Sequence, residues 1–143
     1  AYEYVGIPMN KKEAIRLLKL SAEQGNSAAQ YNLGSIYYNG KAGTPDMVLA
    51  RKWFTEAAIK GYPQAQAALG YLYLHHEPAD YTKAFEWFSK GAENGNAMAL
   101  YYLGECYSNG YGTPENFSKA KQAWKKSADS GYKPAQEKLL SIY

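Results

Sequence analysis

Apolar residues recur along this chain at helical spacing, and they do so in tandem copies. In the copy with the clearest pattern they stand at positions 50, 53, 54, 57 and 58, which lie on one face of an α-helix. A glycine follows this face, and then an alanine, a leucine and a tyrosine at steps of four residues. Four such sets occur: Gly25/Ala29/Leu33/Tyr37, Gly61/Ala65/Leu69/Tyr73, Gly95/Ala99/Leu103/Tyr107 and Gly131/Ala135/Leu139/Tyr143. The pattern predicts a repeat array rather than a domain with a single core.

The helix before each glycine, here called helix B, carries signals for its start and its end. An Asn or Asp stands four residues before the first alanine of its apolar face, at Asn10, Asp46, Asp80 and Asn116. These residue types are preferred N-caps, because the side-chain oxygen accepts from free N–H groups of the first turn. The recurring glycine suits the left-handed residue that follows a helix.

A second helix, helix A, is predicted after each glycine. Its expected ranges are 27–38, 64–74, 98–108 and 134 to the last residue given. Gly34, Gly70 and Gly104 follow the recurring leucine in three of these helices. A glycine inside a helix costs about 1 kcal/mol relative to alanine, so its recurrence predicts close helix packing there.

Four phrases of the sequence resemble the Sel-one-like repeat, a relative of the tetratricopeptide repeat: Tyr31-Asn-Leu-Gly-Ser-Ile-Tyr, Asn39-Gly-Lys-Ala-Gly-Thr-Pro-Asp, Ala50-Arg-Lys-Trp-Phe-Thr-Glu-Ala-Ala and Tyr102-Leu-Gly-Glu-Cys-Tyr-Ser-Asn-Gly-Tyr-Gly. The longer glycine-containing loops favour this family over an ordinary tetratricopeptide repeat. The resemblance implies an all-α fold, a right-handed α/α superhelical solenoid of helix-turn-helix repeats. We expect full repeats at 27–62, 63–96 and 97–132, with a partial repeat at 10–26 (helix B) and another at 133–143 (helix A), in a fragment of a longer array.

The amino-acid composition agrees with a helical array, and it bears on membrane insertion and nucleic-acid binding but not on the cellular compartment. The formal net charge is only +3, and no apolar run approaches the roughly 18 residues of a membrane span. Lysines crowd the last repeat, but acidic residues are interspersed, and the chain has two arginines, Arg16 and Arg51. We therefore expect no nucleic-acid partner and no direct membrane insertion. The sequence does not distinguish bacterial periplasm or secretion, cytoplasm and endoplasmic-reticulum lumen.

Tyrosine is the residue type that points to a function. Of 15 tyrosines, the recurring core position accounts for four. By resemblance, the face of helix A that is not used for packing lines a concave surface, and tyrosine suits recognition because its ring gives contact area and its hydroxyl a hydrogen bond. The expected binding residues are Tyr31, Ser35, Tyr38, Asn39, Tyr71, His75, Tyr101, Glu105 and Asn109. The alternative is that several of these rings only pack between neighbouring repeats.

Candidate catalytic or metal chemistry is sparse. His75-His76-Glu77 is the only histidine cluster and lacks the spacing of a zinc site. Ser118 and Lys121 match a Ser-x-x-Lys pattern without the motifs that accompany it in penicillin-recognising enzymes. Cys106, the single cysteine, stands where other copies have isoleucine or leucine, which predicts a buried apolar role. We expect no cofactor and no metal.

These observations predict a non-enzymatic adaptor that binds a protein or peptide on a tyrosine-rich helix A face. One alternative is a self-association module that forms a homo-oligomer through exposed repeat faces. A less favoured alternative is a cell-wall hydrolase.

Overall fold

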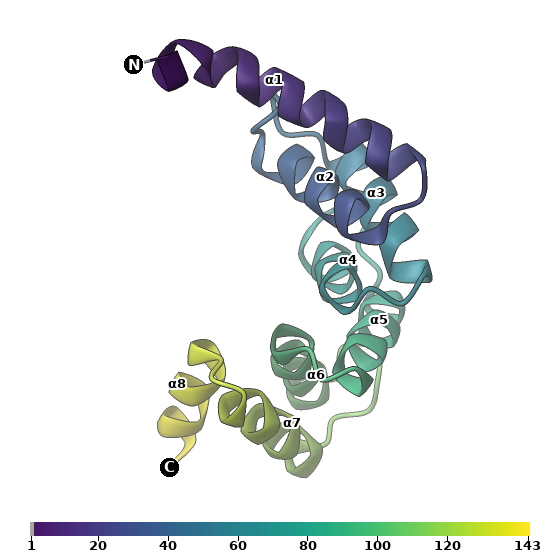
Figure 1. The fold of residues 1–143 in the computed structure, drawn as a ribbon. Helices are drawn as coiled ribbons and strands as arrows, with labels where there is room; N and C mark the ends of the chain where they lie inside the picture. The colour runs from purple at the N-terminus through teal and green to yellow at the C-terminus, as the bar shows by residue number, and fades with distance from the viewer. Residues whose placement is uncertain (1) are drawn as a thin grey trace. The chain divides into compact units, whose positions relative to one another are not determined.

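The protein is described by a computed structural model that covers residues 2–143, with side chains from Asn10 onward. These residues form helices and no strand (Figure 1). The helices are α1 (Tyr2–Glu23), α2 (Ser27–Asn39), α3 (Met47–Ile59), α4 (Pro63–His75), α5 (Tyr81–Glu93), α6 (Ala97–Asn109), α7 (Phe117–Asp129) and α8 (Lys133–Ile142). The chain divides into two compact units, Ala1–Tyr62 with α1 to α3 and Pro63–Tyr143 with α4 to α8.

The predicted alternation of two helix types is confirmed. Helices A are α2, α4, α6 and α8, and helices B are α3, α5, α7 and the later part of α1. Each helix A packs on the helix B that follows it, α2 on α3 in the first unit, and α4 on α5 and α6 on α7 in the second. Each helix B also packs on the next helix A of its unit, as α1 does on α2, α5 on α6 and α7 on α8.

Three of the four predicted N-caps of helix B are confirmed. The Oδ1 atoms of Asp46, Asp80 and Asn116 accept from the backbone N–H three residues further on, at 3.0 Å in each case. The backbone N–H of each cap also donates to the carbonyl of the recurring tyrosine of the preceding helix A, at 2.8–2.9 Å. This hydrogen bond joins the start of helix B to the end of the preceding helix A across the loop between them. The recurring glycines that follow helix B adopt φ between +79° and +97°, as predicted.

The predicted N-cap at Asn10 is wrong, because α1 runs through this residue from Tyr2. The other three caps are held by a carbonyl of the preceding helix A. Asn10 has the local sequence signal of a cap but lies inside α1, so the local signal alone did not fix this helix boundary.

The predicted close packing at the glycines of helix A is confirmed, and its cause is an aromatic ring of the following helix B. A Cβ at Gly34 would lie 2.7 Å from Phe54 Cδ1, and a Cβ at Gly70 would lie 2.8 Å from Phe88 Cδ1. Gly104 lies in the same way under Trp124, whose Nε1 donates to the Tyr101 carbonyl at 3.1 Å. Each ring occupies the space that a side chain on helix A would fill.

Gly34→Ala is expected to destabilise the fold although alanine favours helix. Overpacking a core costs about 1–3 kcal/mol, and the gain in helix propensity offsets about 1 kcal/mol of this. We expect a net loss of up to about 2 kcal/mol, measured by urea unfolding. Asn32→Ala in the same helix is the control, since Asn32 is exposed and its replacement should leave stability unchanged or slightly raised. Equal stability of the two variants would contradict the packing role of Gly34.

Candidate functional site

A continuous row of aromatic side chains runs across the helices A of the second unit. We call it the aromatic row and define it as Tyr71 and His75 of α4, Tyr102 and Tyr101 of α6, and Tyr132 before α8. Successive ring centroids lie 4.5 Å apart for Tyr71 and His75, 5.5 Å for Tyr71 and Tyr102, 5.0 Å for Tyr102 and Tyr101, and 5.6 Å for Tyr101 and Tyr132. The four tyrosines are half-buried and His75 is exposed.

The aromatic row rests directly on the core of the second unit. The Tyr102 ring stacks on Phe88, with centroids 5.2 Å apart and planes at 16°. Phe88 is fully buried and is the ring that covers Gly70. The surface ring at the centre of the row is therefore held by the same contact that fixes the distance between α4 and α5.

An ion pair lies beside the row on α6 and α8. Lys138 Nζ lies 3.2 Å from Glu105 Oε2 and also 5.3 Å from the centroid of the Trp124 ring. Glu105 Oε2 is inaccessible to solvent and has no hydrogen bond, so the lysine neutralises it by charge rather than by a directed bond. Lys138 thereby joins α8 to α6 and α7.

Burial also changes the titration of the row. Burial raises the pKa values of Tyr101, Tyr102 and Tyr132. The Glu105 carboxylate raises those of Tyr101 and Tyr102 further, and neighbouring tyrosines raise those of Tyr102 and Tyr132 further. The shift extends to higher pH the range in which these hydroxyls, like any tyrosine hydroxyl at neutral pH, are protonated and can donate hydrogen bonds. Burial lowers the pKa of His75, and the adjacent His76 lowers it further. Neutral His75 offers a partner a polar edge without a charge.

The predicted residues of the first unit are arranged in a related way. Tyr31 of α2 lies 5.7 Å from the Phe54 ring and 5.6 Å from the Tyr62 ring. Tyr31 and Tyr62 occupy the repeat positions of Tyr101 and Tyr132, so the same ring pair forms in both units. The remaining three residues, also on α2, are half-buried Ser35 and Tyr38 and exposed Asn39.

The structure thus brings Tyr71, His75, Tyr101 and Glu105 together in the second unit, and Tyr31, Ser35, Tyr38 and Asn39 lie on one helix of the first. Asn109 is exposed at the end of α6, where its Nδ2 donates to the Glu105 carbonyl at 3.0 Å. The rings do pack on neighbouring repeats, as the alternative interpretation expected, and they keep part of their surface accessible. Their role in binding stays a prediction.

Sequence reasoning missed Tyr102, Tyr132 and Lys138. Tyr132 had a usable signal, because it directly follows the repeat glycine as Tyr62 does. Tyr102 had none, since Asn32 and Ala68 stand at its position in the other copies.

Of the residues considered for chemistry, His75, Cys106 and Lys121 pack against neighbouring side chains. His75 lies against Tyr71 and Tyr102, and the described residues hold no group of three or more side chains suited to a metal. Cys106 is fully buried, as predicted, and burial together with Glu105 raises its pKa to about 12. Ser118 is exposed, and Lys121 lies with its Nζ 5.4 Å from the Phe117 ring centroid.

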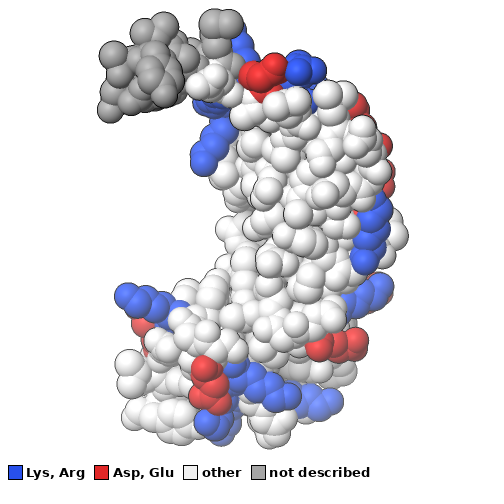
Figure 2. Space-filling model, viewed as in Figure 1, with Lys and Arg blue, Asp and Glu red and all other residues white. Residues whose placement is uncertain are grey.

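Charges are mixed over the end of the second unit. In Figure 2, lysines and acidic residues lie side by side over the region that Figure 1 assigns to α7 and α8. Lys125 pairs with Asp129 at 3.5 Å, one turn away on the same helix. Within the described part of the chain, no helix combines the length and apolar character that crossing a membrane requires.

The repeat organisation matches a known family model. The model described as Sel1 repeat matches residues 3–26, 27–62, 63–96 and 97–132. The chain belongs to the Sel1 repeat family. Its fold is accordingly that of tetratricopeptide-like helix pairs. A solved Sel1 repeat protein from Oxalobacter formigenes superposes with a TM-score of 0.76 at 32% identity, over 90% of this chain and 98% of that one.

Among curated relatives, the rat protein named DAP3-binding cell death enhancer 1 is 35% identical over 104 residues, 73% of this chain and 20% of the relative. The Arabidopsis thaliana ERAD-associated E3 ubiquitin-protein ligase component HRD3B is 36% identical over 108 residues, 73% of this chain and 17% of the relative. The chain spans about a fifth of the length of these relatives.

His75 is expected to titrate below its ordinary pKa of 6.5. Because the fold favours the neutral ring, this contribution to stability is present above pH 6.5 and is lost as pH falls through the lowered pKa. Proton NMR of the ring during a pH titration measures the value. Tyr102→Ala should raise it towards 6.5, and His76→Ala should raise it less, because burial is the larger cause.

Tyr102→Phe is the control for this titration, since it keeps the burying ring and should leave the His75 pKa low. A wild-type value at or above 6.5, or no response to Tyr102→Ala, would contradict the proposed environment of His75.

Proposed function

We propose that this chain is a non-enzymatic adaptor that binds a protein or peptide on the tyrosine-rich face of its helices A. The observation that carries the proposal is the aromatic row, in which four half-buried tyrosines lie in contact across α4, α6 and the turn before α8. Each ring offers apolar area, and each hydroxyl stays a hydrogen-bond donor.

The rigidity of the row supports a role in recognition. Ordering a flexible side chain on binding costs about 0.5–1.5 kcal/mol, and this cost falls when packing has already fixed the side chain. Tyr102 is held by Phe88 beneath it, and Tyr101 by Tyr102 and Tyr132 on its two sides. A partner would therefore meet a surface that needs little rearrangement.

The names of three curated relatives support an adaptor rather than a catalyst. One relative is described as binding DAP3, one as a component of a ubiquitin ligase, and one, from Malassezia restricta, as a chitin synthase regulator. All three descriptions concern association with or control of another protein. The partner of this chain, by the chemistry of the row, is a segment with apolar side chains and free backbone carbonyl groups.

Replacing Tyr31, Tyr71 and Tyr101 by alanine is expected to weaken partner binding, because each of these half-buried rings contributes accessible aromatic area to its helix A. Partners are captured from a lysate of the source organism with the wild-type chain, and the affinity of each is then measured by calorimetry. We expect the affinity to fall at least tenfold, about 1.4 kcal/mol, with the helical circular dichroism retained.

Tyr81→Ala is the matched control, because this exposed tyrosine lies on helix B α5, away from the helix A face. It should bind partners as the wild type does. Capture that is equal for the triple variant and the wild type would move the binding site to the loops or to the helices B.

A further inference from the structure

Helix α7 lacks the tryptophan that the two preceding helices B carry on their packing face. Ala123 stands at the repeat position of Trp53 in α3 and Trp87 in α5. In the first unit Trp53 is buried and packs with Leu33 of helix A, which is 0% exposed. In the pair of α6 and α7 the equivalent leucine, Leu103, is only half-buried. The small side chain of Ala123 thus coincides with a leucine that is left partly uncovered.

A pocket of about 250 Å³ lies at this place, between α6 and α7. We call it the α6–α7 pocket and define it by Leu100, Leu103, Tyr107, Lys119, Ala123 and Lys126. Leu100 adds to its apolar character, because the other three helices A carry glutamine at that position. Helix α5 packs on α6, and α8 packs on α7. The pocket therefore lies inside the described array and not at an end of it.

The charged residues that line the α6–α7 pocket are both lysines, Lys119 and Lys126. Lys119 Nζ lies 5.5 Å from the centroid of the Tyr107 ring. Neither lysine forms an ion pair with any other residue that the structure describes. The pocket thus combines apolar side chains with uncompensated positive charge, and it favours an apolar group that has anionic groups beside it.

The other helices B show how lysine covers an aromatic ring at this repeat position. In α5, Lys90 Nζ lies 4.6 Å from the centroid of the Trp87 ring. In α3, Lys52 Nζ lies 4.7 Å from the centroid of the Trp53 ring. Lys126 of α7 stands at the repeat position of Lys90. A ring bound in the α6–α7 pocket would therefore have Lys126 as a cation–π partner.

We propose that the α6–α7 pocket binds the side chain of a tryptophan in an acidic segment of a partner protein. The indole takes the place that the repeat itself gives to Trp53 and Trp87, and Asp or Glu residues beside it meet Lys119 and Lys126. The pocket is smaller than the roughly 300–1,000 Å³ of typical small-molecule sites, which fits one anchoring side chain. Tryptophan is also prominent among the residues that anchor protein interfaces in pockets.

The α6–α7 pocket and the aromatic row lie on different sides of α6. At 3.6 residues per turn, Leu103 and Tyr107 are about 40° apart around the helix, and Glu105 is about 160° from both. The proposal is therefore independent of the adaptor function assigned to the aromatic row, and it goes beyond that function.

A short peptide tests the pocket directly. The probe is an acetylated and amidated peptide with a central tryptophan and glutamates on both sides, and binding is followed by the methyl NMR signals of Leu100 and Leu103. We expect saturable shifts with a dissociation constant below about 1 mM. Alanine in place of the peptide's tryptophan should weaken binding at least tenfold. Glutamines in place of its glutamates should weaken binding severalfold and remove its dependence on salt.

Ala123→Trp is the decisive variant, because it restores the residue that α3 and α5 carry and fills the pocket from within the chain. It should abolish peptide binding, and its thermal unfolding midpoint should be unchanged or higher. Lys119→Gln/Lys126→Gln leaves the pocket open. It should weaken binding of the glutamate peptide more than binding of the glutamine peptide, because only the former has charges for the lysines to attract.

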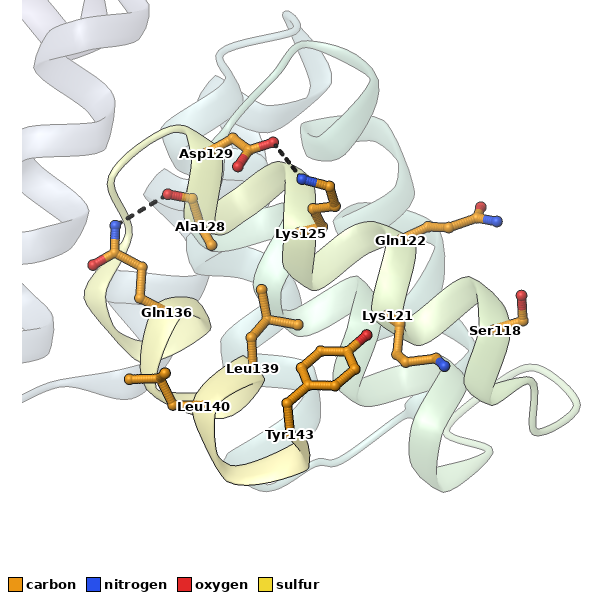
Figure 3. A pocket seen from close by; sticks show the side chains of 10 residues that line it. All are labelled: Ser118, Lys121, Gln122, Lys125, Ala128, Asp129, Gln136, Leu139, Leu140 and Tyr143. Carbon is orange, nitrogen blue, oxygen red and sulfur yellow. Dashed lines mark hydrogen bonds and ion pairs between the residues drawn. The ribbon is translucent and has the colours of Figure 1, made fainter.

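Lys121→Gln/Lys125→Gln is the matched control, since it removes the same charge from two lysines of α7 that line the groove towards α8 (Figure 3). It should bind the peptide as the wild type does, and so should the variant with alanine at Tyr31, Tyr71 and Tyr101, which separates this proposal from the adaptor function.

Three results would overturn the proposal. The first is the absence of methyl shifts at about 1 mM peptide. The second is peptide binding that survives Ala123→Trp in a folded chain. The third is an equal loss of binding in the two lysine-pair variants, which indicates attraction by overall charge and not by the pocket.

Discussion

The contact on which each unit depends is an aromatic ring of helix B lying on a glycine of helix A. It is specific in both directions: the ring fills the space where a Cβ would stand, and the glycine lets the two helix backbones approach. In the second unit the same ring, Phe88, also supports Tyr102 from below. Phe88 therefore takes part both in the packing of α4 on α5 and in the placement of Tyr102 in the aromatic row. A change that shifts Phe88 is expected to shift Tyr102 as well.

That coupling explains why half-buried tyrosines fit both interpretations drawn from the sequence. Their rings do pack between repeats, as Tyr101 does with Tyr132, and the packing is what makes their remaining surface rigid. Burial removes solvent from the charged tyrosinate form and so raises the pKa values of Tyr101 and Tyr102 above the ordinary tyrosine value, at which the hydroxyl is already protonated at neutral pH. A recognition surface built in this way draws its order from the core and offers a partner fixed donors.

The helices could be predicted well from the sequence because the same cap residues and glycines recur at the same position of each repeat. Caps at Asp46, Asp80 and Asn116 and the glycines after helix B are set by short-range hydrogen bonds, which the residues themselves specify. Asn10 shows the limit, because the same local signal lies inside α1 there, whereas the three caps that form also donate to a carbonyl of the preceding helix A. The candidate site was predicted only in part for the same reason. Tyr102 and Lys138 enter it through contacts with residues 31 and 33 positions away, Tyr71 and Glu105, and no local pattern reports such contacts.

A repeated contact is also a problem of specificity, because interchangeable helices could pair in the wrong register or with another copy. Every helix A with the glycine accepts, in principle, every helix B with the ring. Leu140 removes α8 from this set, since its side chain occupies the space of the ring. Leu18 removes α1, since it lacks a ring to fill the space over a glycine. The two departures from the repeat pattern thus change the ring-on-glycine contact only at α1 and α8 among the described helices. In the interior pairs the contact has the same geometry each time, because a ring of helix B lies on a glycine of helix A.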